Sequence, residues 1–398
     1  MDLSSPIIHF LLHSLFLVAF ICPINSSKII NHQKLNQTLR YEDQFKKLNE
    51  TLKSHFQPIN KFAVKAIQSL EGDIIDCVLI HKQPAFNHPL LKGHKLWNPP
   101  KKSKGHKQIT NLSDSIQSWS LSGEFCPEGT IPIRRRKDKF FERKDISQRH
   151  YHATAIVEGG FKGAKANINI WTPSVEKKDE YSAAKIWIIS QSFSENIEVG
   201  WQVFPGKYGD NKTRFFVYWT ADGYNQTGCY NLECPGFIQT NPEIYLERAI
   251  DQTSTYNSNQ YGWSLRIEKD TDSGHWWLGY GEGHILGYWP SNLFKELKGE
   301  AHLVQFGGEV LDINPSGYHT ATSMGSGHFA EEGFGKAAYF SNNQVKVSSN
   351  VWIDPPEPKY SVDHPKCYNL ESWFSSDAGF HFYYGGPGRN GNCLYGYL

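Results

Sequence analysis

Two strand-like segments of the sequence each place a glutamate, a glycine and a glutamine on one face. Side chains alternate between the two faces of a β-strand, and residues 196–203 carry apolar side chains at every second position. Residues 303–310 repeat the arrangement in the opposite order along the chain. The residues that share the two polar faces are Glu198, Gly200 and Gln202 in the first segment and Gln305, Gly307 and Glu309 in the second.

A pair of glutamates that meet on neighbouring strands could carry out acid–base hydrolysis. Two carboxyl groups held close together cannot both ionise cheaply, so they share one proton and their apparent pKa values move apart. The ionised glutamate would take a proton from water, and the protonated one would hydrogen-bond the carbonyl oxygen under attack and then help to protonate the leaving nitrogen. If Glu198 and Glu309 form such a pair, they would be catalytic at acidic pH and would need neither a metal nor a cofactor. The spacing leaves open which is the base, and alone it fits a solvated strand face more readily.

The glycines and glutamines beside the two glutamates are further candidates for this site. A glycine in a strand removes side-chain bulk and lets another backbone come close, so Gly200 and Gly307 are candidate substrate-binding residues. Gln202 and Gln305 share the glutamate faces and are candidates for contacts to the catalytic pair.

Other common catalytic motifs are absent from the sequence. It contains no HExxH zinc motif, no GxSxG nucleophile motif and no GxxxxGK[ST] phosphate loop. His150 and His152 are the nearest approach to a metal-binding pair, and we interpret them as surface histidines. A GxGxxG string at 386–391 is followed by only seven residues, too few for a dinucleotide-binding helix, and predicts a turn.

The glutamate-bearing segments lie in a region, from about residue 150 onward, that is rich in short aromatic and β-branched runs. Aromatic residues make up 14% of the chain, and 34 Gly and 20 Pro supply turns. This composition favours short, turn-linked strands. The fold class that we predict is mostly β, a two-sheet antiparallel β-sandwich of the jelly-roll kind. The expected strands are 166–171, 185–190, 197–204, 214–220, 263–269, 276–281, 302–309 and 337–342.

The region before residue 150 predicts a smaller α+β unit. Apolar residues at helical spacing indicate an amphipathic helix over 45–56 and a second helical stretch over 62–70. A β-branched run predicts a strand at 74–80. A basic cluster begins at residue 134, and we expect a linker and processing region at 134–150.

The two regions carry opposite charges. Residues 27–150 hold 23 Lys or Arg and 12 Asp or Glu, a net charge of +11, whereas residues 151–398 hold 18 and 27, a net charge of −9. Attraction between them is expected of a propeptide and its enzyme, and acidification would weaken it. The whole chain is nearly neutral, at +1, which argues against nucleic-acid binding.

The first 26 residues read as a secretion signal. Their apolar centre spans 15–22, and no later stretch approaches 18 consecutive apolar residues, so no membrane attachment is expected after signal removal. Six cysteines then remain, and in an oxidising compartment they predict three disulfides among 15 possible pairings. Sequence locality favours the pairs Cys77–Cys126, Cys229–Cys234 and Cys367–Cys393. The expected N-glycosylation sites are Asn36, Asn49, Asn111, Asn211 and Asn225.

Longer stretches of the sequence resemble the neprosin family of plant secreted prolyl glutamic endopeptidases. The stretches similar to its peptidase signatures are 197–205, 208–211, 218–224, 227–232 and 307–310, and those similar to its activation peptide are 73–78, 83–86, 88–92 and 126–133. The resemblance implies a β-sandwich whose concave face holds a glutamate pair, which by motif is Glu198 and Glu309. It also supports the three local disulfides.

This resemblance completes an expected organisation along the chain. The expected parts are a signal peptide at 1–26, an activation propeptide at 27–133, the basic linker at 134–150 and a neprosin-like peptidase domain at 151–398. It implies a zymogen that cleaves after proline, is secreted to the cell wall or an acidic extracellular fluid, and has its own propeptide and proline-containing peptides or proteins as partners.

A catalytically silent protein that binds cell-wall carbohydrate is the alternative. Exposed aromatic rings on a secreted β-sandwich can stack on sugars, but in most such folds they fill the core. The candidates for a sugar platform are Trp276, Trp277, Tyr280 and Trp289.

Overall fold

The computed structural model describes residues 59–100, 124–135, 149–225, 227–281, 283–313, 317–375 and 379–396. The expected signal peptide, the helix expected at 45–56 and three of the expected glycosylation sites (Asn36, Asn49 and Asn111) lie outside these residues, as does most of the expected linker. Asn211 and Asn225 lie within them, and both are exposed. No helix in the described part of the chain is long and apolar enough to cross a membrane.

A small antiparallel sheet forms the first part of the described chain. It has the order β1-β2-β3, with β1 (Ala63–Gln68), β2 (Ile74–Leu79) and β3 (Thr130–Arg134). The strand expected at 74–80 is β2, the buried central strand. The helix expected at 62–70 is wrong, because that segment pairs along β2 as β1. Pairing with a buried neighbour overrides local helical spacing here.

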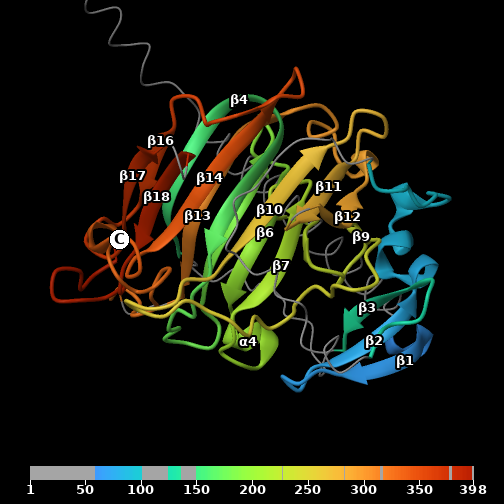
Figure 1. Ribbon diagram of the computed structural model, residues 1–398, viewed down its shortest axis with the longest axis horizontal. Coiled ribbons are helices and arrows are strands. Elements are labelled where there is room, and N and C mark those ends of the chain that lie inside the picture. The colour runs from blue at the N-terminus through green and yellow to red at the C-terminus, as the bar shows by residue number, and fades with distance from the viewer. Residues whose placement is uncertain are drawn as a thin grey trace, which may run out of the picture. The chain divides into compact units, whose positions relative to one another are not determined.

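The rest of the described chain is a large, curled antiparallel sheet system (Figure 1). Its strands are β4 (Arg149–Asn169), β5 (Tyr181–Ile189), β6 (Asn196–Val203), β7 (Arg214–Thr220), β8 (Cys229–Tyr230), β9 (Ile238–Gln239), β10 (Gly262–Lys269), β11 (Trp276–Tyr280), β12 (His284–Trp289), β13 (Ala301–Asp312), β14 (Ala338–Val347), β15 (Trp352–Ile353), β16 (Lys359–Val362), β17 (Asn369–Ser375) and β18 (Gly379–Gly385). The short helices are η1 (Ile59–Phe62), η2 (Ile80–Lys82), η3 (Pro84–Asn87), η4 (Pro89–Leu91), α4 (Pro205–Tyr208), η5 (Ser291–Leu293) and η6 (Ala330–Glu332).

The long strand β4 joins the two layers of the sandwich. Its first half pairs with β13 and β16, and its second half pairs with β10 and β14. One layer runs from β4 through β13, β5, β6 and β7 to β8, and the other runs through β10, β11 and β12 to β9. The predicted mostly-β sandwich is therefore confirmed, and each of the eight expected strands overlaps an observed one.

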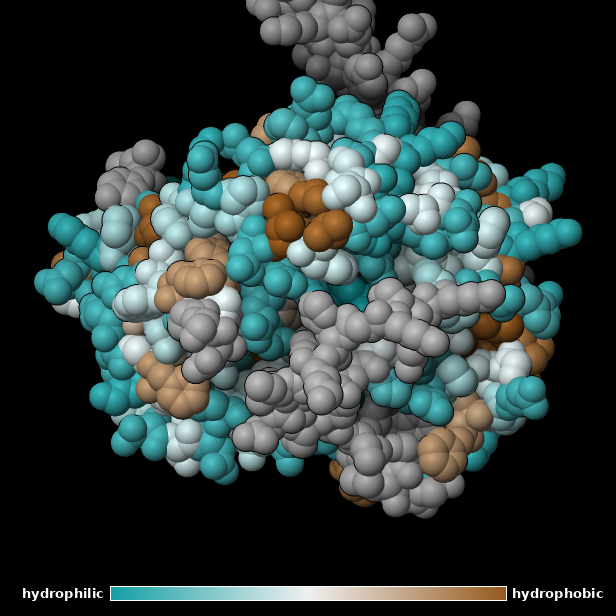
Figure 2. Space-filling view, turned by 45° about the horizontal axis from the view of Figure 1, so that its top comes forward, coloured by the Kyte–Doolittle hydropathy of each residue, from teal (hydrophilic) through white to brown (hydrophobic). Residues whose placement is uncertain are grey.

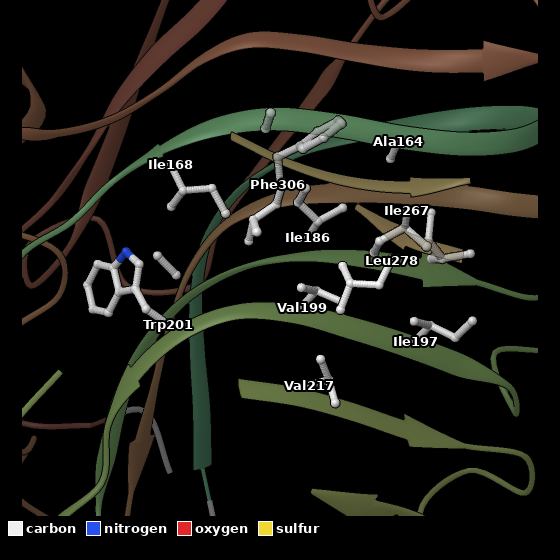
Figure 3. Close-up of a cluster of buried hydrophobic side chains, with 14 of the residues drawn as sticks. Ala164, Ile168, Ile186, Ile197, Val199, Trp201, Val217, Ile267, Leu278 and Phe306 are labelled. Carbon is white, nitrogen blue, oxygen red and sulfur yellow. The ribbon is translucent and has the colours of Figure 1, made fainter. Parts of the chain in front are cut away.

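The main hydrophobic core lies between these layers. Figure 3 shows side chains of β5, β6 and β13, such as Ile186, Val199 and Phe306, turned towards Ile267 and Leu278 of the other layer. The four aromatic residues that could have formed a sugar platform, Trp276, Trp277, Tyr280 and Trp289, are buried in this core. They cannot offer an exposed stacking surface. In the view of Figure 2 the hydrophobic side chains form small, separate patches on a mostly hydrophilic surface.

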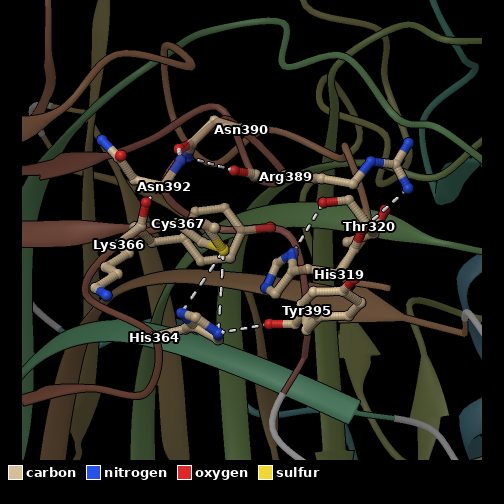
Figure 4. The surroundings of a disulfide bond; sticks show 12 residues. His319, Thr320, His364, Lys366, Cys367, Arg389, Asn390, Asn392 and Tyr395 are labelled. Carbon is tan, nitrogen blue, oxygen red and sulfur yellow. Dashed lines mark hydrogen bonds between the residues drawn. A yellow bond between two sulfur atoms is a disulfide. The ribbon is translucent and has the colours of Figure 1, made fainter. Parts of the chain in front are cut away.

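Three disulfides link positions that are close in the sequence. They join Cys77 to Cys126, Cys229 to Cys234, and Cys367 to Cys393. The first ties β2 of the small sheet to the chain just before β3. The last holds the C-terminal segment and is drawn with its surroundings in Figure 4.

Candidate active site

Strand β5 lies between β6 and β13, and this order positions the two candidate glutamates. In register, Lys185 of β5 faces Gly200 of β6 on one side and Gly307 of β13 on the other. Glu198 pairs with Trp187 and Glu309 pairs with Ala183, one step of the alternation to either side of Lys185. The two glutamates therefore lie diagonally across the lysine on one sheet face, away from the main core.

The two glutamates meet at the ammonium group of Lys185. Its Nζ forms a hydrogen-bonded ion pair with Oε2 of Glu198 and an ion pair with Oε2 of Glu309. Lys185 and Glu309 are each 4% exposed and Glu198 is 5% exposed. From the sequence we expect a shared proton between the carboxyls, whereas the structure has a buried cation there. One ammonium between two carboxylates neutralises half of their charge and removes the need for that proton.

Glu198 has two further hydrogen-bond donors. The Tyr224 hydroxyl donates to its Oε1 at 2.8 Å, and the Asn196 amide donates to the same oxygen at 3.2 Å. Tyr224 follows β7 and stacks on Tyr218, with 5.8 Å between ring centroids. Burial and the neighbouring Glu198 carboxylate raise the pKa of Tyr224 well above its ordinary value, so the hydroxyl keeps its proton and remains a donor.

Glu309 is surrounded by donors from β4 and β5. The Tyr181 hydroxyl donates to Oε1 at 2.9 Å, Nδ1 of His150 contacts the same oxygen, and Nε2 of His152 lies 3.8 Å from it. Nδ1 of His152 lies 2.8 Å from a carboxylate oxygen of Asp363. The interpretation of His150 and His152 as surface histidines is therefore wrong: both are partly buried and both face Glu309.

These contacts set the charge of the site. Burial would raise the pKa of Glu309, but Lys185, His150 and His152 outweigh it and hold that pKa well below its ordinary value. Burial would lower the pKa of Lys185, but the two glutamates outweigh it and raise that pKa. Burial would also lower the pKa of His152, but the carboxylates of Asp363 and Glu309 outweigh this effect and raise that pKa. The surroundings thus favour the ionised carboxylate of Glu309 and the charged ammonium of Lys185.

The glycines and glutamines predicted to support the pair have structural contacts of their own. A Cβ on Gly200 would lie 2.0 Å from the Ala184 carbonyl oxygen, and one on Gly307 would lie 2.3 Å from the Ala153 carbonyl oxygen. The room that these glycines create is therefore filled by neighbouring strands of the chain itself and is not open to a substrate. The two glutamines bond elsewhere: Gln202 donates to the Tyr208 hydroxyl at 2.7 Å and Gln305 to the Thr154 hydroxyl at 2.9 Å.

Two family models match the sequence. The neprosin model matches residues 178–387, and the neprosin activation peptide model matches residues 66–162. The first covers more than half of the chain and includes both glutamates. The chain belongs to the neprosin family. Its upstream match is to that family's activation peptide, so the chain is a zymogen-type precursor with the peptidase region downstream.

Solved structures also resemble this neprosin. Scytalido-glutamic peptidase in complex with a transition-state analogue inhibitor has 11% identity and a TM-score of 0.35, over 60% of this chain and 98% of that one. SCP-B, a member of the eqolisin family of peptidases, has 10% identity and a TM-score of 0.33 over the same shares. A homodimeric agglutinin from chicken liver, CG-16, has 9% identity and a TM-score of 0.19, over 42% of this chain and 96% of that one.

Two small apolar clusters flank the charged centre of the neprosin region on the same sheet face. One consists of Trp187, Ile189 and Leu303 with Ile156 beside them. The members of the other are Tyr181, Ala183, Phe204, Tyr208, Phe216, Tyr218 and Leu311. Apolar surroundings of this kind keep water away from the ion pairs and strengthen them.

A second cluster of potential ligands lies near the C-terminus of this neprosin. Ligand atoms of His319, Cys367 and Cys393 lie within 4.8 Å of one another. Figure 4 shows His319 and His364 beside the Cys367–Cys393 disulfide, with His364 bonded to the Tyr395 carbonyl oxygen. Because both sulfurs are joined in a disulfide, neither is a thiolate, and this cluster is a structural feature of the C-terminal segment.

Several residues of the neprosin site were missed from the sequence. They are Lys185, Tyr181, Asn196, Tyr224 and Asp363. A signal for Lys185 was present, since it is the charged residue in the otherwise apolar run 183–189 and faces opposite Ile186 and Ile188. Tyr224 ends the stretch 218–224, which resembles a family signature, but the sequence did not assign it to the site. No comparable signal marks Asp363, and both residues lie outside the strands that carry the glutamates.

Proposed function

We propose that this protein is a secreted glutamic endopeptidase, made as a zymogen, that cleaves peptide bonds after proline at acidic pH. The observation that carries the proposal is the convergence of Glu198 and Glu309 on one buried ammonium on a single sheet face. Membership of the neprosin family supports the peptidase activity, and the family resemblance supplies the preference for proline. Three disulfides fit an oxidising compartment, and we place the protein in the cell wall or an acidic extracellular fluid.

Glu309 is the member of the pair that acts as the base. Its pKa is held well below the ordinary value, after burial has been outweighed by Lys185 and the two histidines, so it stays ionised in acid. It takes a proton from water as the water oxygen bonds to the carbonyl carbon. The ammonium of Lys185, which Glu198 holds in place, stabilises the negative oxygen that forms. The carbon–nitrogen bond then breaks, and the proton on Glu309 passes to the leaving nitrogen.

The activation peptide region is the proposed internal partner. The Gln83 side chain and the Gln239 backbone exchange two hydrogen bonds, at 3.0 and 2.8 Å. Asp73 forms an ion pair with the buried Arg214 at 2.8 Å. These contacts hold the small sheet against the peptidase domain at neutral pH, and removal of the region through a cut within 134–150 would yield the active form.

A digestion experiment tests the proposal. The secreted precursor is incubated at pH 4 to 5 and then mixed with a denatured protein that contains many prolines, and the products are sequenced by mass spectrometry. New termini that follow proline are expected from the parent chain and not from Glu198→Gln or Glu309→Gln. The matched control is Glu158→Gln, which alters an exposed ion pair with Lys359 and should cut like the parent. Equal cutting by Glu309→Gln would overturn the proposal.

A further inference from the structure

Lys185 is a buried cation whose partners are all supplied by the chain itself. Its Nζ reaches both glutamates and lies 4.7 Å from the centroid of the Trp187 ring and 5.9 Å from that of Phe216. A fully buried ammonium is costly unless it is paired. Here two carboxylates and two aromatic faces surround it.

Titratable groups from four segments of the chain surround the cluster formed by Lys185, Glu198 and Glu309. Strand β4 contributes His150 and His152, β5 contributes Tyr181, and the segment after β7 contributes Tyr224. Behind His152 lies the carboxylate of Asp363. Without Lys185, Glu198 and Glu309 would face each other across the space that the ammonium now occupies, and they could remain close only by sharing a proton.

We propose that Lys185 takes the part that a protonated carboxyl would play in this site, so that the hydrolysis depends on a fixed ammonium instead of a proton shared between Glu198 and Glu309. This rests on the proposed function. Lys185 is thereby a positioning residue for the two carboxylates in the resting enzyme and the hydrogen-bond donor that becomes available during the reaction.

The reaction step balances with this charge distribution. As Glu309 takes the proton from water, it becomes neutral and no longer competes for the ammonium hydrogen. That hydrogen is then free to bond to the carbonyl oxygen, which receives the π electron pair as the water oxygen bonds to carbon. When the electron pair returns and the carbon–nitrogen bond breaks, Glu309 gives its proton to the nitrogen. Lys185 keeps all of its protons throughout, and no oxidant, metal or further acid is consumed.

The test compares pH–rate profiles of the converted parent enzyme and Lys185→Gln. Without the ammonium, the two carboxyls must share a proton to work, so the alkaline limb of the Lys185→Gln profile should move at least about one unit to lower pH. The matched control is Lys269→Gln, which removes another buried lysine, one whose ammonium is held by the carbonyls of Gly274 and Leu297. Its profile should match that of the parent. The proposal would be overturned if the alkaline limb of the Lys185→Gln profile is not shifted. It would also be overturned if Lys185→Gln is active while the parent enzyme is inactive.

A second measurement separates this inference from the proposed function. Potentiometric titration of the folded proteins from pH 7 to pH 4 should show about one proton more taken up by Lys185→Gln than by the parent or by Lys269→Gln. Equal uptake overturns the inference even if all the proteins are active. If every protein is inactive on peptides, the proposed function fails. The difference in proton uptake between Lys185→Gln and the parent then still tests whether Lys185 replaces a shared proton.

A double variant covers the case in which Lys185→Gln does not fold at neutral pH. Lys185→Gln/Glu198→Gln removes one charge of each sign and should fold at both pH 7 and pH 4. The single variant should then recover its fold at pH 4, where a shared proton relieves the repulsion. A single variant that stays unfolded at both pH values, beside a folded double variant, would contradict the proposal.

Discussion

At the residue scale, the two glutamates differ in their surroundings. Glu309 is approached by an ammonium, a hydroxyl and two imidazoles, whereas Glu198 is approached by the same ammonium, a hydroxyl and an amide. Positively charged or chargeable groups therefore gather on the Glu309 side. This difference is the physical reason to assign the ionised base to Glu309, since each such neighbour favours the carboxylate over the carboxylic acid.

The Asp363 carboxylate should control the charge of His152. It accepts from the backbone N–H of His152 at 2.8 Å and contacts its Nδ1. We expect Asp363→Asn to lower the pKa of His152. Burial of the ring lowers this pKa and the carboxylates of Asp363 and Glu309 raise it, so after the substitution only the Glu309 carboxylate would raise it. The loss of the contact should cost about 1 kcal/mol of unfolding free energy. NMR titration of the imidazole checks the shift.

The sign of the accompanying pH dependence is fixed. Because the pKa of His152 is raised above its ordinary 6.5, its ion pairs stabilise the fold fully below about pH 6.5 and are lost as the pH rises through the raised value. The stability difference between the parent and Asp363→Asn should therefore be larger at pH 5.5 than at pH 9. A difference that grows with rising pH would contradict this account of His152.

At the element scale, the site depends on how closely β5 approaches its two neighbours. Lys185 can reach both glutamates because glycine stands opposite it on β6 and on β13. A Cβ on Gly200 would lie 2.7 Å from the Lys185 Cα and 2.8 Å from its Cβ. The two glycines opposite Lys185 thus allow β5 to pack closely against β6 and β13, and this packing positions the ammonium.

Gly200→Ala should weaken both the fold and the activity. The added methyl group would collide with the β5 backbone, which cannot move without separating β5 from β6, so we expect a loss of about 1–3 kcal/mol. The matched control is Gly391→Ala, where an added Cβ meets nothing within 4 Å and the change should stay within about 0.5 kcal/mol. Denaturant unfolding measures both. Equal stability of the two variants would contradict the packing argument.

The strands and the glutamate face were predictable from sequence because they depend on local alternation. In β6 and β13 the apolar side chains point to the main core and leave Glu198 and Glu309 on the other face, as the period of two requires. The Lys185 bridge was not predictable, since it needs the order β6-β5-β13, which no local pattern encodes. The error at β1 has the same origin, because pairing with β2 decided a segment whose own spacing favoured a helix.

At the scale of the whole molecule, the segment that follows β2 of the small sheet meets the peptidase domain at titratable groups. The Nε2 atom of His94 lies 2.9 Å from the Tyr288 hydroxyl, and His275 stacks on the same tyrosine ring at 5.0 Å. Nδ1 of His275 accepts the Ser291 N–H at 3.2 Å, a bond that requires an unprotonated nitrogen. Burial and the nearby His94 lower the pKa of His275 to about 4.

Acid should loosen the segment 88–97 in particular. Since His275 has its pKa below the ordinary 6.5, its contribution to the contact is complete above about pH 6.5 and declines as the pH falls towards 4. Hydrogen exchange, corrected for intrinsic rates, should show at least about tenfold less protection of 88–97 at pH 4.5 than at pH 7. His275→Asn should reduce this pH dependence, and an unchanged dependence would argue against His275.

The turn between β1 and β2 supplies an internal control of opposite sign. Burial and the Glu71 carboxylate raise the pKa of Asp251 to about 6, so this pair repels at neutral pH and the repulsion is relieved as the pH falls below 6. Protection around Glu71 should therefore not fall together with that of 88–97. A uniform loss across the small sheet would indicate general unfolding instead of a local release.

The most direct test of the central claim is the kcat/KM of the converted enzyme on a peptide with proline before the scissile bond, measured for the parent, Glu198→Gln, Glu309→Gln and the double variant. Each single change should lower kcat/KM by about 10²–10⁴-fold, and the double variant should lose little more than the worse single variant, because the two groups act as one unit. Glu158→Gln should match the parent. Retention of parental activity by either single variant, or losses that multiply in the double variant, would contradict the glutamate-pair account.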